Sequence, residues 1–129
     1  MRIGELAERA GTTAKTLRFY EEQGLLSPAD RTPSGYRDYK SDAVARVGFV
    51  HRGQAAGLTL AQIRQILDIR DGGSAPCEHV RNLLHTRLAA IEQQIAQLTA
   101  LHASIAVLRD TAADPAPDSC NPDLVCRYL

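Results

Sequence analysis

Apolar residues near the start of the chain recur every three or four positions and predict two short helices. The first covers residues 2–10 and ends at Gly11, and the second runs from about Ala14 to Gln23 and ends at Gly24. Two short helices joined by a turn that contains glycine are typical of a helix-turn-helix. Any small helical hairpin would give the same pattern, so DNA binding is one of two interpretations at this point.

Residues 25–40 follow a different pattern. Prolines and a Ser-Gly pair mark turns, and Gly35 to Tyr39 alternate with a period of two, as in a short hairpin strand. Basic residues interleave with tyrosines along this stretch. A basic, aromatic hairpin directly after a helix-turn-helix is typical of a wing that grips DNA phosphates, and the alternative is a solvated loop.

Two further helices are expected after the hairpin. One covers about residues 42–55, and the next begins after the capping residue Thr59 and carries an apolar stripe from Leu60 to Leu67. The stretch 71–76 is rich in Gly, Ser and Pro and interrupts the helical pattern. We therefore expect the main domain boundary there.

No Gly or Pro occurs from Cys77 to Asp110, which predicts one helix of about 34 residues, roughly 50 Å long. Its apolar positions form a single narrow seam, interrupted at His102, and they are Leu84, Leu88, Ile91, Ile95, Leu98, Ile105 and Leu108. A lone helix cannot bury such a seam. The pattern therefore predicts a coiled coil whose partner is a second copy of the chain.

Composition narrows the class of protein. The chain has 129 residues, of which 44% are hydrophobic, so wholesale disorder is not expected. No run of 18 apolar residues occurs, and the polar, amphipathic start does not resemble a signal peptide. These features predict a cytoplasmic protein without a membrane partner.

The distribution of charge and the number of cysteines indicate which ligands the protein could bind. The net charge is zero, but residues 1–70 carry 11 Lys or Arg against 8 Asp or Glu, whereas residues 71–129 carry 4 against 7. A positive first half is a weak indication of nucleic-acid binding. Three cysteines in a reducing compartment favour metal binding or redox chemistry over structural disulfides. We find no nucleophile–base pair, Gly-rich phosphate loop or paired-carboxylate site, and therefore expect no catalytic activity.

Several motifs together resemble the MerR family of bacterial transcription regulators, in particular its heavy-metal-sensing branch. They are Ile3-Gly4-Glu5-Leu6-Ala7, Thr16-Leu17-Arg18-Phe19-Tyr20-Glu21, Gly24-Leu25-Leu26, Arg31 and Gly35-Tyr36-Arg37-Asp38-Tyr39. The resemblance covers the whole chain. It implies a mainly all-α fold with a winged helix-turn-helix DNA-binding domain at 1–70, an antiparallel coiled-coil dimerisation helix at 77–110 and a metal-binding loop at 111–129.

The resemblance also implies a mechanism. A homodimer binds double-stranded promoter DNA whose −35 and −10 elements are too far apart for RNA polymerase holoenzyme, and the effector-bound form distorts the spacer until the polymerase engages both. The implied DNA-binding residues are Thr13, Lys15, Thr16, Arg18, Tyr20, Arg31, Tyr36 and Arg37. Arg18 and Tyr20 are expected at phosphates. For Tyr20 and Tyr39, packing under the wing is the alternative.

The tail indicates which effector to expect. The 19 residues after Asp110 are too few for a drug-binding domain, and the tail lacks the four clustered cysteines of an iron–sulfur sensor. Of the effector classes known in the family, metal sensing is the one that remains. The predicted metal ligands are Cys77, Cys120 and Cys126.

Geometry constrains how these ligands meet. Cys77 begins the long helix, whereas the other two cysteines follow its far end, and the loop from Asp110 to Cys120 reaches at most about 35 Å. One chain is therefore not expected to bring the three thiols together. In an antiparallel dimer, Cys77 of one subunit could meet Cys120 and Cys126 of the other.

The family pattern suggests the ion. Cys77 resembles the cysteine of divalent sensors for zinc, cadmium, lead or mercury, whereas sensors of copper(I) or silver carry serine there. Such divalent sensors usually have a loop cysteine near Ala112 or Ala113, which is missing here, so Cys120 could instead be a spare thiol. His or Asp could supply a fourth ligand. The alternatives are a monovalent-metal sensor, a thiol-redox sensor that uses Cys120 and Cys126, and, from another class, a metal chaperone or detoxifying enzyme.

Overall fold

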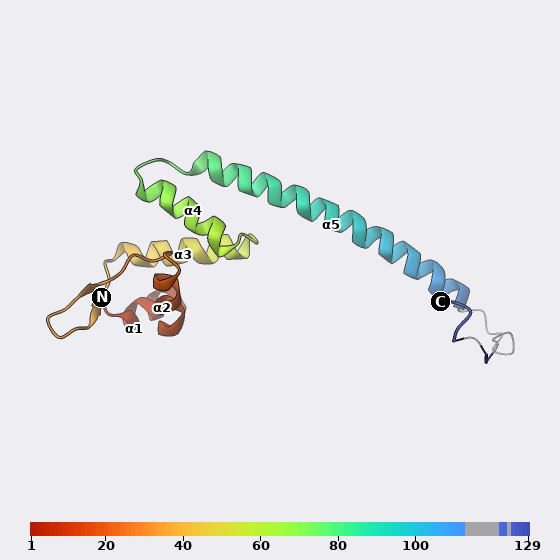
Figure 1. The fold of residues 1–129 in the computed structure, drawn as a ribbon, viewed down its shortest axis with the longest axis horizontal. Helices are drawn as coiled ribbons and strands as arrows, with labels where there is room; N and C mark the ends of the chain where they lie inside the picture. Colours follow the sequence, from red (N-terminus) through yellow and green to blue (C-terminus); the bar gives the residue numbers. More distant parts are fainter. Residues whose placement is uncertain (113–121, 124) are drawn as a thin grey trace. The chain divides into compact units, whose positions relative to one another are not determined.

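The structure, a computed structural model, describes residues 1–112, 122–123 and 125–129. In chain order its elements are α1 (Ile3–Ala10), α2 (Ala14–Glu22), β1 (Asp30–Arg31), β2 (Arg37–Asp38), α3 (Asp42–Ala55), α4 (Leu60–Asp71) and α5 (Cys77–Ala112) (Figure 1). The chain packs as two units, Met1–Arg87 and Leu88–Leu129. None of the described helices is both long and apolar enough to span a lipid bilayer.

The turn between α1 and α2 follows from local chemistry. Gly11 ends α1 at a φ of 69°, a left-handed conformation that costs glycine nothing, and its N–H reaches the carbonyls of Ala7 and Glu8. Thr13 then caps α2, because its hydroxyl accepts a hydrogen bond from the N–H of Thr16 at 3.2 Å. The predicted pair of short helices is confirmed.

One hydrophobic core holds the first unit together. It takes residues from all four short helices and from the connections between them, among them Leu6, Leu17, Val47 and Ile63, all almost fully buried. Each such aliphatic side chain contributes about 1.5–3 kcal/mol relative to an exposed position. This packing fixes α2 against α1 and α3 and so sets the orientation of the helix-turn-helix.

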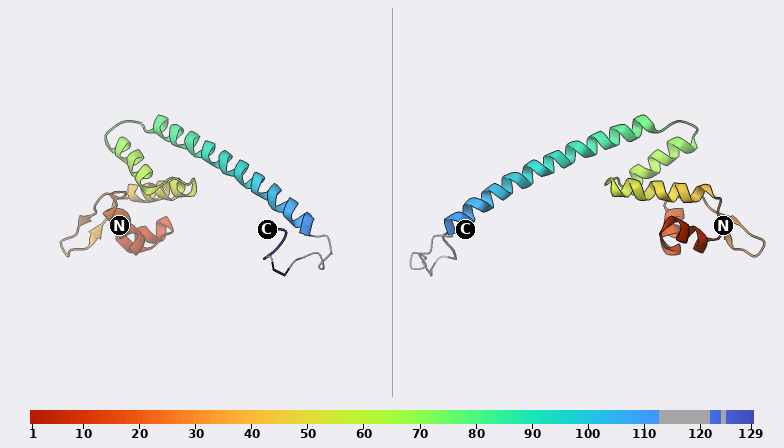
Figure 2. Two further views of the ribbon diagram at one scale, coloured as in Figure 1. Left: turned by 45° about the vertical axis from the view of Figure 1, so that its right-hand side comes forward. Right: turned by 180° about the vertical axis from the view of Figure 1, so that it is seen from behind.

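The hairpin after α2 is a small antiparallel sheet. Asp30 pairs with Asp38 and Arg31 with Arg37, and the N–H of Gly35 donates to the Thr32 carbonyl within the turn. In both views of Figure 2 it extends away from the helices that precede and follow it. The predicted wing is confirmed, with paired strands of two residues each.

A capping box starts α4. The Thr59 hydroxyl accepts from the N–H of Gln62 at 3.1 Å, and the Gln62 carboxamide accepts from the N–H of Thr59 at 3.0 Å. The turn before it contains Gly57, at a φ of 81°. Val80 and Leu83, on the first turns of α5, pack against the core of the same unit.

The long helix α5 has 36 residues and extends two positions beyond the predicted end. None of its residues is buried, and most apolar side chains of the seam are exposed, including Leu84, Leu88, Ile95, Leu98 and Ile105. The predicted apolar seam therefore faces solvent in the isolated chain. The division into 1–70, 77–110 and 111–129 stays a prediction, and most of the last segment lies outside the described residues.

Candidate functional site

Five of the predicted DNA-binding residues lie at the start or along the length of α2, and all except Tyr20 are at least partly exposed. The side chains of Thr13, Lys15 and Arg18 are exposed, and Thr16 is half-buried. The hydroxyl groups of Thr13 and Thr16 are 3.0 Å apart and take part in the helix cap. Lys15 and Arg18 are therefore the cationic groups that this helix offers to a polyanion.

Tyr20 lies on the opposite, inward side of α2. Its side chain is 4% exposed, its hydroxyl donates to Oε1 of Gln54 on α3 at 3.2 Å, and its ring meets that of His51 edge-on. Burial raises the pKa of its hydroxyl. These contacts favour the packing role that the sequence left open for Tyr20.

The wing carries the other three predicted residues. Arg31 is exposed and donates from Nη1 to the carbonyl of Gly35 at 3.0 Å, which closes the turn. Tyr36 is 55% exposed, and the guanidinium of Arg2 lies 4.4 Å from the centre of its ring, a cation–π contact. Arg37 is only 29% exposed and donates from Nε to Oε2 of Glu21 at 3.0 Å.

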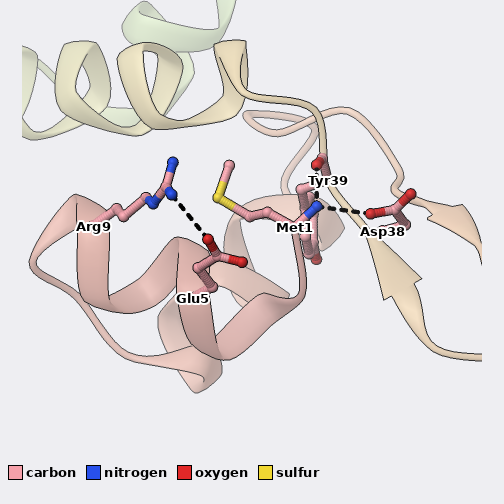
Figure 3. A network of polar contacts seen from close by, with 5 residues as sticks. All are labelled: Met1, Glu5, Arg9, Asp38 and Tyr39. Carbon is pink, nitrogen blue, oxygen red and sulfur yellow. Dashed lines mark hydrogen bonds and ion pairs between the residues drawn. The ribbon is translucent and has the colours of Figure 1, made fainter.

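The first residue of the chain ties the wing to α1 (Figure 3). The Met1 ammonium donates to Oδ1 of Asp38 at 2.7 Å and to the carbonyl of Tyr39 at 2.8 Å, and the Tyr39 N–H donates back to the Met1 carbonyl at 2.7 Å. An exposed ion pair between Glu5 and Arg9 lies nearby on α1. The sequence pattern does not reveal this connection, because its partners are more than 35 positions apart.

Two of the three cysteines predicted as metal ligands lie within the described residues. Cys77 is the first residue of α5 and is exposed, Cys126 is exposed near the C-terminus, and Cys120 lies outside the described residues. No group of three or more His, Cys, Asp or Glu residues that could hold a metal ion occurs within the described part of the chain. The predicted metal-ligand set of Cys77, Cys120 and Cys126 therefore stays a prediction.

The histidines on α5 differ in environment. The Nε2 atom of His79 is buried and has no hydrogen-bond partner among the described residues, whereas His85 and His102 are exposed. Of the acidic residues that could complete a metal site, Asp118 lies outside the described residues and Asp123 within them.

A capped helix-turn-helix, followed by a hairpin with exposed cationic and aromatic side chains, defines a winged-helix DNA-binding protein. Comparison with known families agrees with this class. Residues 1–69 match the family described as "MerR HTH family regulatory protein", and residues 44–108 match "MerR, DNA binding".

Individual relatives cover most of the chain. It is 35% identical over 105 residues to the transcriptional regulator HmrR of Rhizobium leguminosarum bv. viciae, covering 81% of each protein. It is 34% identical over 119 residues to the regulator ZntR of Escherichia coli K12, covering 92% of this chain and 84% of ZntR. Among solved structures, the lead(II) complex of PbrR691 from Ralstonia metallidurans CH34 is 33% identical with a TM-score of 0.77, covering 93% and 94% of the two chains.

The chain therefore belongs to the MerR family of transcription regulators. It is a DNA-binding regulator and not an enzyme, as the sequence predicted.

Proposed function

We propose that this protein is a metal-responsive transcriptional regulator that binds a promoter as a homodimer and activates transcription by distorting the spacer DNA. The effector in this proposal is a divalent heavy-metal ion, namely zinc, cadmium, lead or mercury. The observation that carries it is the exposed thiol of Cys77 at the first residue of α5, in a chain that resembles a lead-bound regulator over 93% of its length.

DNA recognition in this proposal uses α2 and the wing. Lys15 and Arg18 approach the duplex from α2, and Arg31, Tyr36 and Arg37 approach the phosphates from the hairpin. The exposed side chains of Lys15, Arg18 and Arg31 support these contacts. Thr13 and Thr16 add hydroxyl groups at the N-terminus of α2, where backbone N–H groups favour an anionic phosphate.

Dimerisation in this proposal uses the seam of α5. Two antiparallel copies would remove Leu88, Ile95 and Leu98, all more than half exposed in one chain, from water. Burial of apolar area contributes about 25 cal/mol per Å², so burial of a continuous seam of this kind would favour association of two helices.

The proposed metal site is shared between subunits. Cys77 of one subunit binds the ion with Cys120 and Cys126 of the other. At about 1.5 Å per residue the 36-residue helix is roughly 50 Å long, which supports a site built across the dimer. Three thiolates suit soft divalent ions, and zinc would take a fourth ligand from His or Asp.

Metal binding would activate transcription by changing the effective separation of the −35 and −10 promoter elements. In the proposed cycle the metal-free dimer represses on its operator, and the metal-bound dimer bends and untwists the spacer until RNA polymerase holoenzyme contacts both elements. The energy of DNA deformation is of the order of 1–10 kcal/mol, within reach of a metal–thiolate site.

In vitro transcription tests the proposal. A promoter bound by the protein is transcribed with RNA polymerase holoenzyme in the presence of zinc, cadmium, lead, mercury, copper(I) or silver, one at a time, with a thiol reductant present. A separate metal-free reaction contains an oxidant and no reductant. We expect activation by at least one divalent ion and no activation by oxidants. Activation by copper(I) and silver alone would replace the divalent assignment with a monovalent one, and activation by oxidants without metal would replace it with thiol-redox sensing.

A further inference from the structure

Glu21, the penultimate residue of α2, contacts the wing at two separate points. Its Oε1 atom accepts a hydrogen bond from the N–H of Ala29 at 3.0 Å, just before β1. Its Oε2 atom accepts from Nε of Arg37 at 3.0 Å, in β2. One carboxylate therefore contacts the residue before β1 through one oxygen and β2 through the other.

The carboxylate is well shielded. The Glu21 side chain is 14% exposed, compared with 29% for its partner Arg37. The buried phenol of Tyr39 lies within its electrostatic reach: burial first, and then the charge of Glu21, raise the pKa of Tyr39 to about 12. A carboxylate this enclosed loses hydration and keeps its place through the hydrogen bonds it accepts.

The next residue provides a contrast. Glu22 carries the same charge on the same helix, but its side chain is exposed and makes no hydrogen bond or ion pair within the described part of the chain. The difference between the two residues is therefore contact and not charge.

We propose that Glu21 is a positioning residue for DNA binding: it fixes the wing against the recognition helix α2 and orients the guanidinium of Arg37. Because Glu21 occupies Nε, the two terminal amino groups of Arg37 are left as donors, and neither has a hydrogen-bond partner among the described residues. A guanidinium held by one edge and open at the other is suited to a phosphate oxygen.

This inference rests on the proposed DNA contact of the wing, and it makes a prediction opposite in sign to simple electrostatics. Removal of an acidic residue near bound DNA normally strengthens binding, because less negative charge opposes the phosphates. If Glu21 positions the wing, its removal weakens binding despite the favourable change in charge. Glu22→Ala is the matched control, since it removes the same charge from the neighbouring position.

The experiment measures binding to a fluorescent 30-base-pair duplex, selected from a random library by the wild-type full-length protein, at several salt concentrations. We expect Glu22→Ala to bind as tightly as wild type or up to a few-fold more tightly. We expect Glu21→Ala to bind about ten-fold more weakly, consistent with the loss of one charge-assisted contact. The slope of log K against log salt should fall by about one in Glu21→Ala, the change expected when one phosphate contact is lost.

Further variants separate positioning from folding. Glu21→Gln keeps the side-chain shape and an acceptor for Ala29, so it should recover part of the affinity and keep the thermal unfolding temperature close to wild type. In an Arg37→Ala background, Glu21→Ala should cost less affinity than it does alone, because the residue it orients is already absent. A variant that merely contains unfolded protein would lower the active fraction without changing the salt slope.

Three results would decide against the inference. Glu21→Ala binding as tightly as Glu22→Ala with an unchanged slope would overturn it, as would equal costs of Glu21→Ala with and without Arg37. If Glu21→Ala does not fold, wild-type affinity and salt slope in Glu21→Gln would overturn the inference. Failure of the wild-type protein to select or bind any duplex would instead reject the proposed DNA-binding function itself.

Discussion

Replacement of Gly57 by alanine should destabilise the protein for two separable reasons. Gly57 has a φ of 81°, a conformation that costs a residue with a Cβ atom about 1–2 kcal/mol. The added Cβ would also lie 2.5 Å from Nε and 2.8 Å from Nη2 of Arg87, closer than packed atoms allow. The guanidinium of Arg87, whose Nε is buried, must then move away from the end of α3.

The size of the effect can be estimated against a control in the same unit. Gly73 has a φ of 90°, and nothing lies within 4 Å of the position its Cβ would take, so Gly73→Ala should cost the backbone term alone, about 1–2 kcal/mol. Gly57→Ala should cost about 1 kcal/mol more, since the long side chain of Arg87 can move but loses its packing. Urea denaturation followed by circular dichroism, at one fixed protein concentration, measures both free energies of unfolding.

A double variant tests the second reason directly. In an Arg87→Ala background the steric conflict is absent, so Gly57→Ala should then cost the same as Gly73→Ala. Equal losses of stability for Gly57→Ala and Gly73→Ala in the wild-type background would refute the reasoning. They would show that the contact between Arg87 and the turn before α4 contributes nothing to folding.

Three further predictions concern DNA, metal and pH. Arg18→Ala and Arg37→Ala should each weaken operator binding and reduce its salt dependence without changing metal affinity; wild-type binding and slope in either variant would remove that residue from the phosphate contacts. Cys77→Ser should sharply reduce the transcriptional response to divalent ions while operator binding persists; an unchanged zinc or cadmium dose–response would exclude Cys77 as a ligand. The hydrogen bond from Arg46, and then its charge, lower the pKa of the Asp71 carboxyl, so this pair stabilises the fold above pH about 4 and the contribution is lost as the pH falls below that value. Asp71→Asn should flatten the acid limb of a stability-against-pH curve, and an unchanged limb would contradict the assignment.

The elements could be predicted from sequence because local chemistry defines them. Gly11 and the capping residues Thr13 and Thr59 occur where the structure begins or ends a helix, and the absence of Gly and Pro after Cys77 predicts the long helix α5. The structure extends α5 two residues beyond the predicted end, because Thr111 and Ala112 continue the helix and no glycine or proline stops it at Asp110.

Roles that depend on distant contacts could not be predicted in the same way. Tyr20 and Glu21 are adjacent in a recognisable motif, yet one is buried against Gln54 of α3 and the other binds Arg37 of the wing. Neither contact leaves a periodic signal in the sequence, since the partners lie 34 and 16 positions away. The sequence includes Glu21 only as part of a family motif, and the packed structure shows that its carboxylate contacts Ala29 and Arg37.

The most direct test of the shared metal site is a count of bound ions in a designed heterodimer. One subunit carries Cys77→Ser, and the other carries Cys120→Ser with Cys126→Ser, so a site built within one chain would be incomplete in both. A site built across the dimer would lose all three thiols at one end and keep all three at the other. Two different affinity tags isolate the heterodimer, and elemental analysis gives the ion content per dimer.

We predict about one tightly bound divalent ion per heterodimer and none in either variant homodimer, because a helix about 50 Å long separates the two ends in one chain. A count near zero in the heterodimer, with about two ions in the wild-type dimer, would contradict the shared site.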